Sequence, residues 1–192
     1  MNYLSSLQEA VMWIVKERDQ KPPSDKLVLA LVTAEKSSRQ TKPLYTSQQL
    51  QGTWRLCFIT GTKKAKNRAG VVLRAGRYLP RWATVELTYT PQISSAQGTL
   101  ENSIKLGVFS LTLTGPAKFS QPKNILAFDF TRISITLGNV NIYQGKIRGG
   151  KQSEEKFYGE KIKKQAFFTY FLMEDNLLAA RGRGGGLALW GR

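Results

Sequence analysis

Hydrophobic and polar positions follow two different periods along the chain, and the period changes after roughly the first quarter of the sequence. Over residues 3–18 apolar side chains recur every three to four positions, as they do on one face of an amphipathic helix. These positions are Tyr3, Leu4, Leu7, Val11, Ile14 and Val15. Lys-Pro-Pro at 21–23 ends this helix, and Ser24 or Asp25 can cap a second one. The apolar positions of the second helix are Leu27, Leu31 and Val32. The pattern predicts an N-terminal helical segment over residues 1–45, packed on the remainder of the chain.

From about residue 50 apolar and polar positions alternate, which is the period of a half-buried β-strand. The alternating segments are 53–59, 84–89, 109–114, 128–130, 133–137, 140–142 and 167–171. Gly138-Asn139 is typical of a two-residue hairpin turn. Short strands with frequent turn signals indicate an antiparallel barrel or sandwich, and closure removes exposed edges. We therefore predict a mostly β fold, an antiparallel β-barrel over residues 46–192. The polar segments 61–70 and 145–165 are predicted loops.

The charge balance points to an anionic partner. Twenty-nine Lys and Arg against thirteen Asp and Glu give a formal net charge of +16. Nucleic acid, an anionic membrane surface and an acidic protein would all be attracted. No acidic residue occurs between Lys36 and Val85. Within this stretch the predicted docking residues are Lys63, Lys64, Lys66, Arg68, Arg74, Arg77 and Arg81. The sequence has no aromatic RNA-recognition signature, GXXG clamp or helix-turn-helix pattern, so nucleic acid ranks third.

The residue types exclude several kinds of catalytic site. Histidine is absent, which rules out His-based triads and His-based metal sites. The single Cys57 lies in the apolar run TWRLCFIT, as a buried thiol would. Asp129, Glu174 and Asp175 show no spacing that pairs them for acid-base chemistry. We therefore expect no enzymatic activity, no metal and no covalent cofactor.

We also expect neither a membrane-spanning segment nor a signal peptide. No run approaches the roughly 20 apolar residues that span a bilayer. The first twenty residues contain Glu9, Glu17 and Asp19 and lack the basic start and cleavage site of a signal peptide. If the protein works at a membrane, we expect a peripheral attachment.

The aromatic residues on the predicted strands can have either of two roles. The apolar faces of a small barrel enclose packed side chains, or a cavity for one small lipophilic molecule. The candidate lining residues are Trp54, Phe109, Phe128, Phe130, Tyr143, Phe167 and Phe171. The sequence leaves both alternatives open.

Three stretches together carry a resemblance to a known family. They are Gly-Thr-Trp-Arg-Leu at 52–56, FDF…ITLG at 128–138 and FLMEDNLLAARGRGGGL at 171–187. The chain resembles, over essentially its whole length, the plastid lipid-associated proteins, also called plastid fibrillins or plastoglobulins, which have cyanobacterial members. That family opens its barrel with GxWxLxYT and closes it with a pattern like YLDEDLRISRGDGGSLFVL.

The motifs match position by position, with departures in the acidic part. Gly52 and Trp54 take the opening motif. The closing motif matches at Arg181, Gly182, Gly184 and Gly185, and the final strand continues it at Leu187 and Leu189. The departures are Glu174 and Asn176 in place of Asp, Leu178 in place of Arg and Arg183 in place of Asp. These changes remove negative charge and weaken any ligand role for the acidic cluster.

The resemblance also interprets the ending AARGRGGGLALWGR. A disordered RGG tail needs repeated boxes, whereas here a single box precedes alternating Leu187 and Leu189. We therefore expect a glycine turn followed by a last strand, with positive φ angles that glycine adopts at little cost. Because lipocalin-like barrels often cover the first-strand Trp with a late Arg, we predict that Arg181 stacks on Trp54 as a cation–π pair.

The family implies a non-enzymatic, lipocalin-like barrel associated with the lipids of photosynthetic membranes in cyanobacteria or plastids. It implies a bound carotenoid, quinone or similar lipid, and peripheral docking of the basic face on the cytoplasmic or stromal side of thylakoids. The alternative is an interaction or assembly protein with a filled barrel that docks on an acidic photosystem or antenna complex. A nucleic-acid binder is the third hypothesis.

Overall fold

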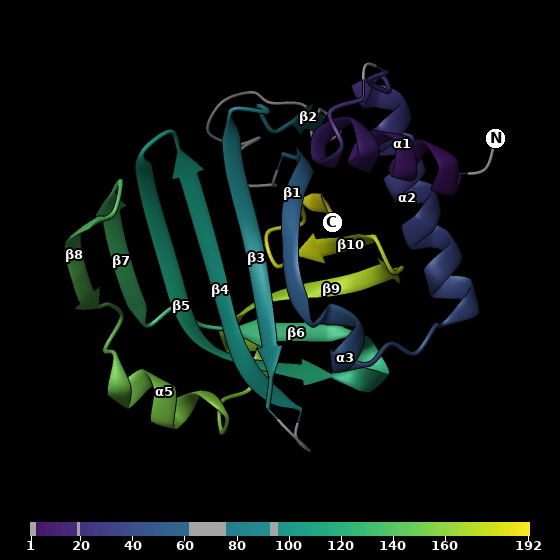
Figure 1. Cartoon of the computed structure of the whole chain (residues 1–192). Helices are drawn as coiled ribbons and strands as arrows, with labels where there is room; N and C mark the ends of the chain where they lie inside the picture. Colours follow the sequence, from purple (N-terminus) through teal and green to yellow (C-terminus); the bar gives the residue numbers. More distant parts are fainter. Residues whose placement is uncertain (1–2, 19, 62–75, 93–95) are drawn as a thin grey trace. The chain divides into compact units, whose positions relative to one another are not determined.

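The computed structural model describes residues 3–18, 20–61, 76–92 and 96–192. The chain is mostly β: its strands form an antiparallel β-barrel, and the longer helices lie in the N-terminal segment (Figure 1). This confirms the fold class predicted from the alternation. The chain divides into two compact units. Unit 1 comprises Met1–Tyr45, Trp54–Leu79 and Phe168–Arg192, and unit 2 comprises Thr46–Thr53 and Pro80–Phe167.

Unit 1 is a layer of two helices on an antiparallel sheet of order β2-β1-β11-β10-β9. The helices are α1 (Tyr3–Val15) and α2 (Ser24–Thr41). The strands are β1 (Gly52–Thr60), β2 (Gly76–Tyr78), β9 (Ala166–Met173), β10 (Leu177–Gly182) and β11 (Leu187–Gly191). Both predicted helices are present, but the N-cap of α2 is Pro23 and not Ser24 or Asp25, and no side chain caps this helix.

The two helices cover one face of this sheet. A single apolar cluster joins helix residues such as Leu7, Leu27 and Leu31 to the strand residues Phe58 and Leu189. Full burial of each such side chain contributes about 1.5–3 kcal/mol, so the amphipathic faces hold the helices in place. Gly191 permits the close approach of α1, since a Cβ at this glycine would lie 2.2 Å from Val11 Cγ1.

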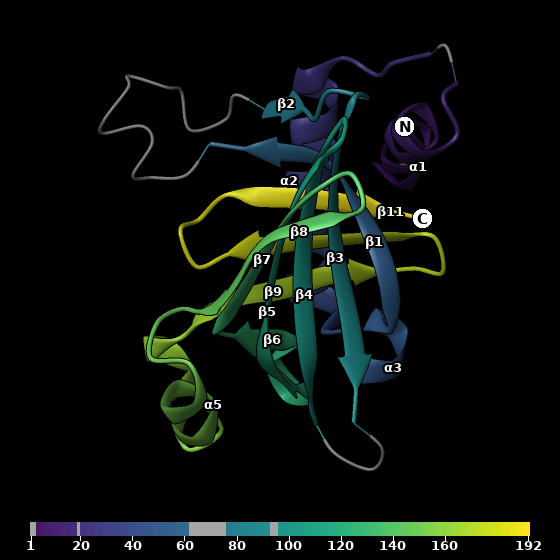
Figure 2. The same cartoon turned by 60° about the vertical axis from the view of Figure 1, so that its left-hand side comes forward.

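Unit 2 is built around a sheet of long strands (Figure 2). Its strands are β3 (Ala83–Pro91), β4 (Gln97–Leu106), β5 (Phe109–Ser120), β6 (Ile125–Phe128), β7 (Arg132–Leu137) and β8 (Val140–Lys146). β4 pairs with β3 and β5. The first half of β5 pairs with β7 and the second half with β6, and β8 pairs with β7. Gly115 lies at the division between the two halves of β5. A Cβ there would lie 1.9 Å from the Asp129 carbonyl oxygen, so glycine permits the close approach of the segment between β6 and β7.

Short helices complete unit 2. They are α3 (Ser47–Leu50), α5 (Lys151–Phe157) and the 3-10 helices Gln121–Lys123 and Ile162–Lys164. The prediction of a loop over 145–165 is therefore wrong. Phe157 of α5 is only 2% exposed, and burial of this ring supports a helix that periodicity over so few residues does not reveal. The predicted hairpin turn at Gly138 joins β7 to β8 with a φ of 58°. The other predicted loop, 61–70, lies outside the described residues from 62 onward.

Candidate functional site

The unit 2 sheet has one apolar and one polar face. The antiparallel register places alternate residues of β3, β4, β5 and β7 on the same side. One side, the apolar face, carries Val85, Leu87, Tyr89, Leu100, Asn102, Ile104, Leu111, Leu113, Ile133 and Ile135. The other side, the polar face, carries Thr84, Glu86, Thr88, Thr99, Glu101, Ser103, Thr112, Thr114, Arg132 and Ser134. Such a division predicts water or polar groups on one side and apolar groups on the other.

The apolar face is not buried along its whole length. Leu87, Tyr89 and Leu100 are at most 5% exposed, as in an ordinary core. Farther along the strands the side chains are only half-buried, and these are Val85, Ile104, Leu111, Leu113, Ile133 and Ile135. At the ends of their strands Leu106 is 40% exposed and Leu137 49% exposed. An aliphatic row that becomes progressively more exposed offers surface to a further apolar group.

Two buried polar atoms interrupt the apolar face. The Tyr89 hydroxyl and the Asn102 Oδ1 atom have no hydrogen-bond partner among the described residues. Tyr89 pairs with Leu100, two residues before Asn102 on β4, so the two polar residues are diagonal neighbours. Burial raises the pKa of Tyr89 to about 12, which keeps its hydroxyl protonated as a donor. Since buried polar groups are normally hydrogen-bonded, these two atoms would fit a ligand that carries a polar group.

Several predicted lining residues lie on or beside this face. Phe109 is opposite Leu106. Phe128 is opposite Ala117 and extends the apolar face, and its side chain is buried at 8% exposure. The ring centroid of half-buried Phe130 is 5.2 Å from that of Phe128. Tyr143 is opposite Ile135 but is 52% exposed, so it lies at the open margin of the face. Phe167, at the start of β9, is half-buried.

Trp54 and Phe171 lie in unit 1, on opposite faces of its sheet. Trp54, 1% exposed, shares the face of Trp190, whose ring contacts Phe168 and Tyr170. Phe171 instead belongs to the cluster under α1 and α2, which corrects its assignment as a lining residue. The stretch Ala-Phe-Phe-Thr-Tyr-Phe-Leu-Met is apolar on both faces, so alternation does not reveal which face the helices cover. For the same reason, alternation does not identify Phe168, Tyr170 and Trp190 as aromatic residues grouped on one face.

The glycine-rich ending forms a turn and a buried strand, as predicted. The Gly182 amide donates to the Gly186 carbonyl at 2.9 Å, and the Gly185 amide donates to the Gly182 carbonyl at 2.8 Å. Gly185 has a φ of 87°, and exposed Gly184 lies in the same turn. All five residues of β11 are buried. Gly52 of the opening motif has a φ of 103°, again a conformation that favours glycine.

The predicted stack of Arg181 on Trp54 is wrong. Arg181 instead donates from Nε to Glu35 Oε1 at 2.7 Å and from Nη2 to Glu35 Oε2 at 2.5 Å. Its Nη1 donates to the Gly185 carbonyl. Trp54 is covered by Arg192, whose Cζ lies 3.9 Å from the ring centroid. Arg181 pairs with Leu187, a residue of the helix-side cluster, and therefore points toward α2.

The predicted docking residues are only partly described. Lys63, Lys64, Lys66, Arg68 and Arg74 lie outside the described residues. Arg77 and Arg81 are exposed. The structure adds a second group of exposed lysines around α5, consisting of Lys146, Lys151, Lys156, Lys161 and Lys163. The lysine-rich stretch 145–165 is the sequence signal for this group, although its pattern predicts only a loop.

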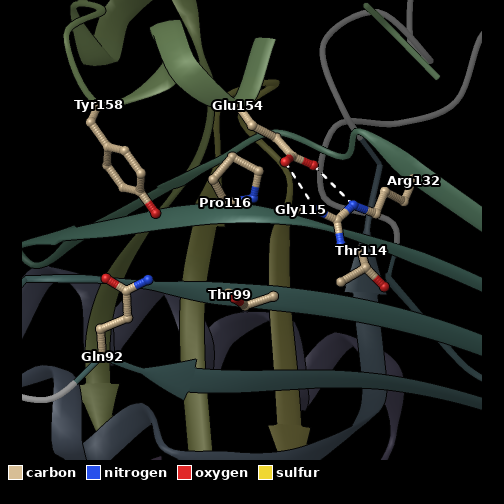
Figure 3. Close-up of a pocket in the computed structure, with 8 residues that line it drawn as sticks. All are labelled: Gln92, Thr99, Thr114, Gly115, Pro116, Arg132, Glu154 and Tyr158. Atoms are coloured by element: carbon tan, nitrogen blue, oxygen red, sulfur yellow. Dashed lines mark hydrogen bonds and ion pairs between the residues drawn. The ribbon is translucent and has the colours of Figure 1, made fainter. Parts of the chain in front are cut away.

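A polar pocket of about 210 Å³ lies between α5 and the polar face (Figure 3). Its charged groups bind one another: Glu154 accepts from Arg132 Nε and Nη2, each at 3.0 Å, and from Thr131 Oγ1 at 2.6 Å. The Thr131 hydrogen bond, followed by the Arg132 interactions, lowers the pKa of Glu154. The Lys118 ammonium donates to the carbonyls of Phe157, Tyr158 and Glu160. These contacts anchor α5, and the satisfied Glu154 carboxylate does not resemble a catalytic base.

Other signs of function are sparse. Among the described residues no three or more acidic or cysteine side chains gather as metal ligands. Burial raises the pKa of Cys57 to about 12, which disfavours the thiolate that a nucleophile needs. Over the same parts of the chain, no helix is long and apolar enough to cross a bilayer. Comparison with known protein families and with curated proteins finds no match.

Proposed function

We propose that this protein is a non-enzymatic lipid-associated protein that binds a lipophilic small molecule on the apolar face of unit 2. The observation that carries the proposal is the incomplete burial of this face. A closed core would bury Leu111, Leu113, Ile133 and Ile135 as fully as it buries Leu100, which is 0% exposed. A bound apolar molecule would remove this remaining surface from water, with a gain of about 25 cal/mol for each Å².

The buried polar atoms narrow the ligand chemistry. A ligand with a carbonyl could accept from the Tyr89 hydroxyl, and one with a hydroxyl could donate to Asn102 Oδ1. Prenylated quinones, tocopherol and oxygenated carotenoids combine such a group with a long apolar body. The resemblance of the opening and closing motifs to plastid lipid-associated proteins favours the same compounds and a place at thylakoid membranes.

The charge supports docking on an anionic membrane surface. Each Lys or Arg near an anionic leaflet contributes about 1 kcal/mol, and the formal net charge is +16. Exposed Arg77 and Arg81 are described residues of the basic stretch that could face lipid headgroups. Docking of this kind weakens as salt screens the charges.

The test is a titration of purified protein with Nile red, a neutral lipophilic dye whose fluorescence rises in apolar surroundings. Leu113→Gln places an amide on the apolar face, and Thr112→Gln places the same amide on the polar face one residue away. We expect Leu113→Gln to weaken dye binding about tenfold, a loss of about 1.4 kcal/mol, and Thr112→Gln to leave it unchanged. Equal affinities for the two variants, with far-ultraviolet circular dichroism that shows both to be folded, would contradict the proposal.

A second candidate is an assembly protein that docks on an acidic photosynthetic complex. The exposed lysines around α5 favour it, because they form a second cationic group on the surface of unit 2. Co-purification with a photosystem or antenna complex, without bound lipophile and with no Nile red affinity, would support this candidate over the first.

A further inference from the structure

One end of the unit 2 sheet exposes large apolar side chains. The β4–β5 and β7–β8 turns lie side by side there, since the Gly138 amide donates to the Val108 carbonyl at 2.7 Å. Trp82 precedes Ala83, which pairs with Leu106 at the same end. This end, the apolar tip, comprises Trp82, Leu106, Val108, Leu137, Val140 and Ile142, which are 40–73% exposed. Figure 1 shows the strand ends concerned at the top of β3, β4, β5 and β7.

The composition of the tip is unusual for turns. Turns that face water are normally rich in Gly, Asn, Asp, Ser and Pro. Here the Gly107 turn carries Val108 at 69% exposure, and the turn at Gly138 leads directly into Val140 at 66%. Isolated exposed apolar residues are common, but a group drawn from three connections at one end of a sheet indicates an interaction site.

We propose that the apolar tip inserts into the headgroup region of an anionic bilayer. This inference rests on the proposed lipid-associated function and names the surface that enters the membrane. Trp82 and Tyr143 have an apolar ring with a polar edge, the kind of side chain that concentrates at membrane interfaces. Exposed Arg81 directly precedes Trp82 in the chain and would meet anionic headgroups.

The charge also selects the bilayer over a second copy of the chain. A second copy carries the same net charge of +16 and would be repelled, whereas an anionic leaflet attracts the protein.

Insertion would have a direct consequence for the ligand. Leu106 and Leu137 belong both to the tip and to the rows of the apolar face, so the open end of that face would lie in lipid. A lipophile could then pass between bilayer and protein without crossing water.

Tryptophan quenching by brominated lipids tests the insertion. Trp82 is 73% exposed, whereas Trp54 and Trp190 are 1% and 3% exposed and Trp13 is half-buried against Tyr78, so the variant Trp82→Phe is needed to assign the quenching to Trp82. Wild-type protein is added to vesicles of phosphatidylglycerol and brominated phosphatidylcholine. We expect strong quenching that persists at high salt once the protein is bound, and its loss in Trp82→Phe with little change in vesicle binding.

A matched pair of variants supplies the second readout. Val108→Asp should lower vesicle partitioning by about tenfold or more, because a carboxylate opposes insertion and is repelled by the anionic leaflet. The control Leu29→Asp makes the same change in charge on α2, at a side chain that is 67% exposed, and should lower partitioning less than about twofold. Equal partitioning of the two variants, or no bromine quenching of bound wild-type protein, would overturn the inference.

Two further outcomes separate this inference from the proposed function. If Val108→Asp makes a self-associating wild-type protein monomeric in sedimentation while vesicle binding stays unchanged, the tip is a dimer surface and the inference is wrong. Nile red binding without vesicles is measured on the same samples. Intact dye binding with no insertion overturns only the inference, and insertion without dye binding overturns only the apolar-face ligand site.

Discussion

The ion pair between Arg181 and Glu35 links the closing motif to helix α2, and its removal should therefore destabilise the fold. Replacement of Glu35 by Gln removes the negative charge and keeps the size of the side chain. Arg181 would then retain its charge at a side-chain exposure of 36%, with only the Gly185 carbonyl and a neutral amide as acceptors. We expect the variant to fold with a lower free energy of unfolding.

The burial of the pair sets the magnitude. Breaking a fully buried ion pair costs about 3–5 kcal/mol, and breaking an exposed one costs about 0–1 kcal/mol. Glu35 is 12% exposed in its side chain and binds Arg181 through both carboxylate oxygens, so the cost lies between these limits, at about 2 kcal/mol. For a chain of this size each kcal/mol lowers Tm by about 2–4 °C, which gives a decrease of about 4–8 °C.

The loss of unfolding free energy in Glu35→Gln should depend on pH. The hydrogen bond from Arg181 is the main cause that lowers the pKa of Glu35 from its ordinary value of 4.5. The folded state therefore binds this proton less readily than the unfolded state does. The stabilisation is complete above pH 4.5 and is lost as the pH falls through the lowered pKa. The difference between wild type and Glu35→Gln should shrink over that acidic range.

Thermal and urea unfolding near neutral pH and at acidic pH provide the assay. Arg39→Ala is the control, since Arg39 also binds Glu35, at 3.0 Å, but is 73% exposed in its side chain. It should cost no more than about 0.5 kcal/mol. If Glu35→Gln is no less stable than Arg39→Ala at neutral pH, the pair does not anchor the closing motif to α2.

Three further predictions concern single residues of unit 1. Gly185→Ala forces a side chain into a φ of 87° and should cost about 1–2 kcal/mol, seen as a lower Tm. Arg192→Ala removes the cation that covers Trp54 and should cost about 1 kcal/mol, with increased acrylamide quenching of tryptophan fluorescence; unchanged quenching would contradict the stack. Cys57, with a pKa raised to about 12, should not react with a thiol reagent near neutral pH until the chain unfolds, and rapid labelling of folded protein would show it to be accessible.

The sequence predicted the elements whose pattern is regular and missed those whose pattern is broken. The apolar positions of the two helices predicted α1 and α2, and alternation predicted β1, β5 and β7. Strand β4 was missed because Gly98 and Asn102 occupy apolar-face positions and interrupt its alternation. Val32, predicted on the buried side of α2, is 41% exposed, since the buried positions of that helix are Leu27, Val28, Ala30, Leu31 and Ala34.

The candidate site can be identified only when the register of the strands is known. Phe109 and Phe128 were identified from their strand positions, but the apolar face became evident only when pairing placed Ile104, Leu111 and Ile135 together. The same is true of the apolar tip, since Val108 and Leu137 are far apart in sequence. A cation–π stack on Trp54 is present, but its arginine is Arg192 and not Arg181. Which arginine covers the ring depends on the face of the sheet from which each side chain projects.

If the apolar face of unit 2 holds a lipophile, organic extraction of the folded protein will recover that molecule. Purified protein is incubated with the pigments and lipids of thylakoid membranes, re-isolated and extracted with organic solvent. An absorption spectrum and mass spectrometry then identify what it carried. We expect a quinone, tocopherol or carotenoid in a fixed molar ratio for wild type and Thr112→Gln, and little for Leu113→Gln. An empty extract from folded wild-type protein would contradict it.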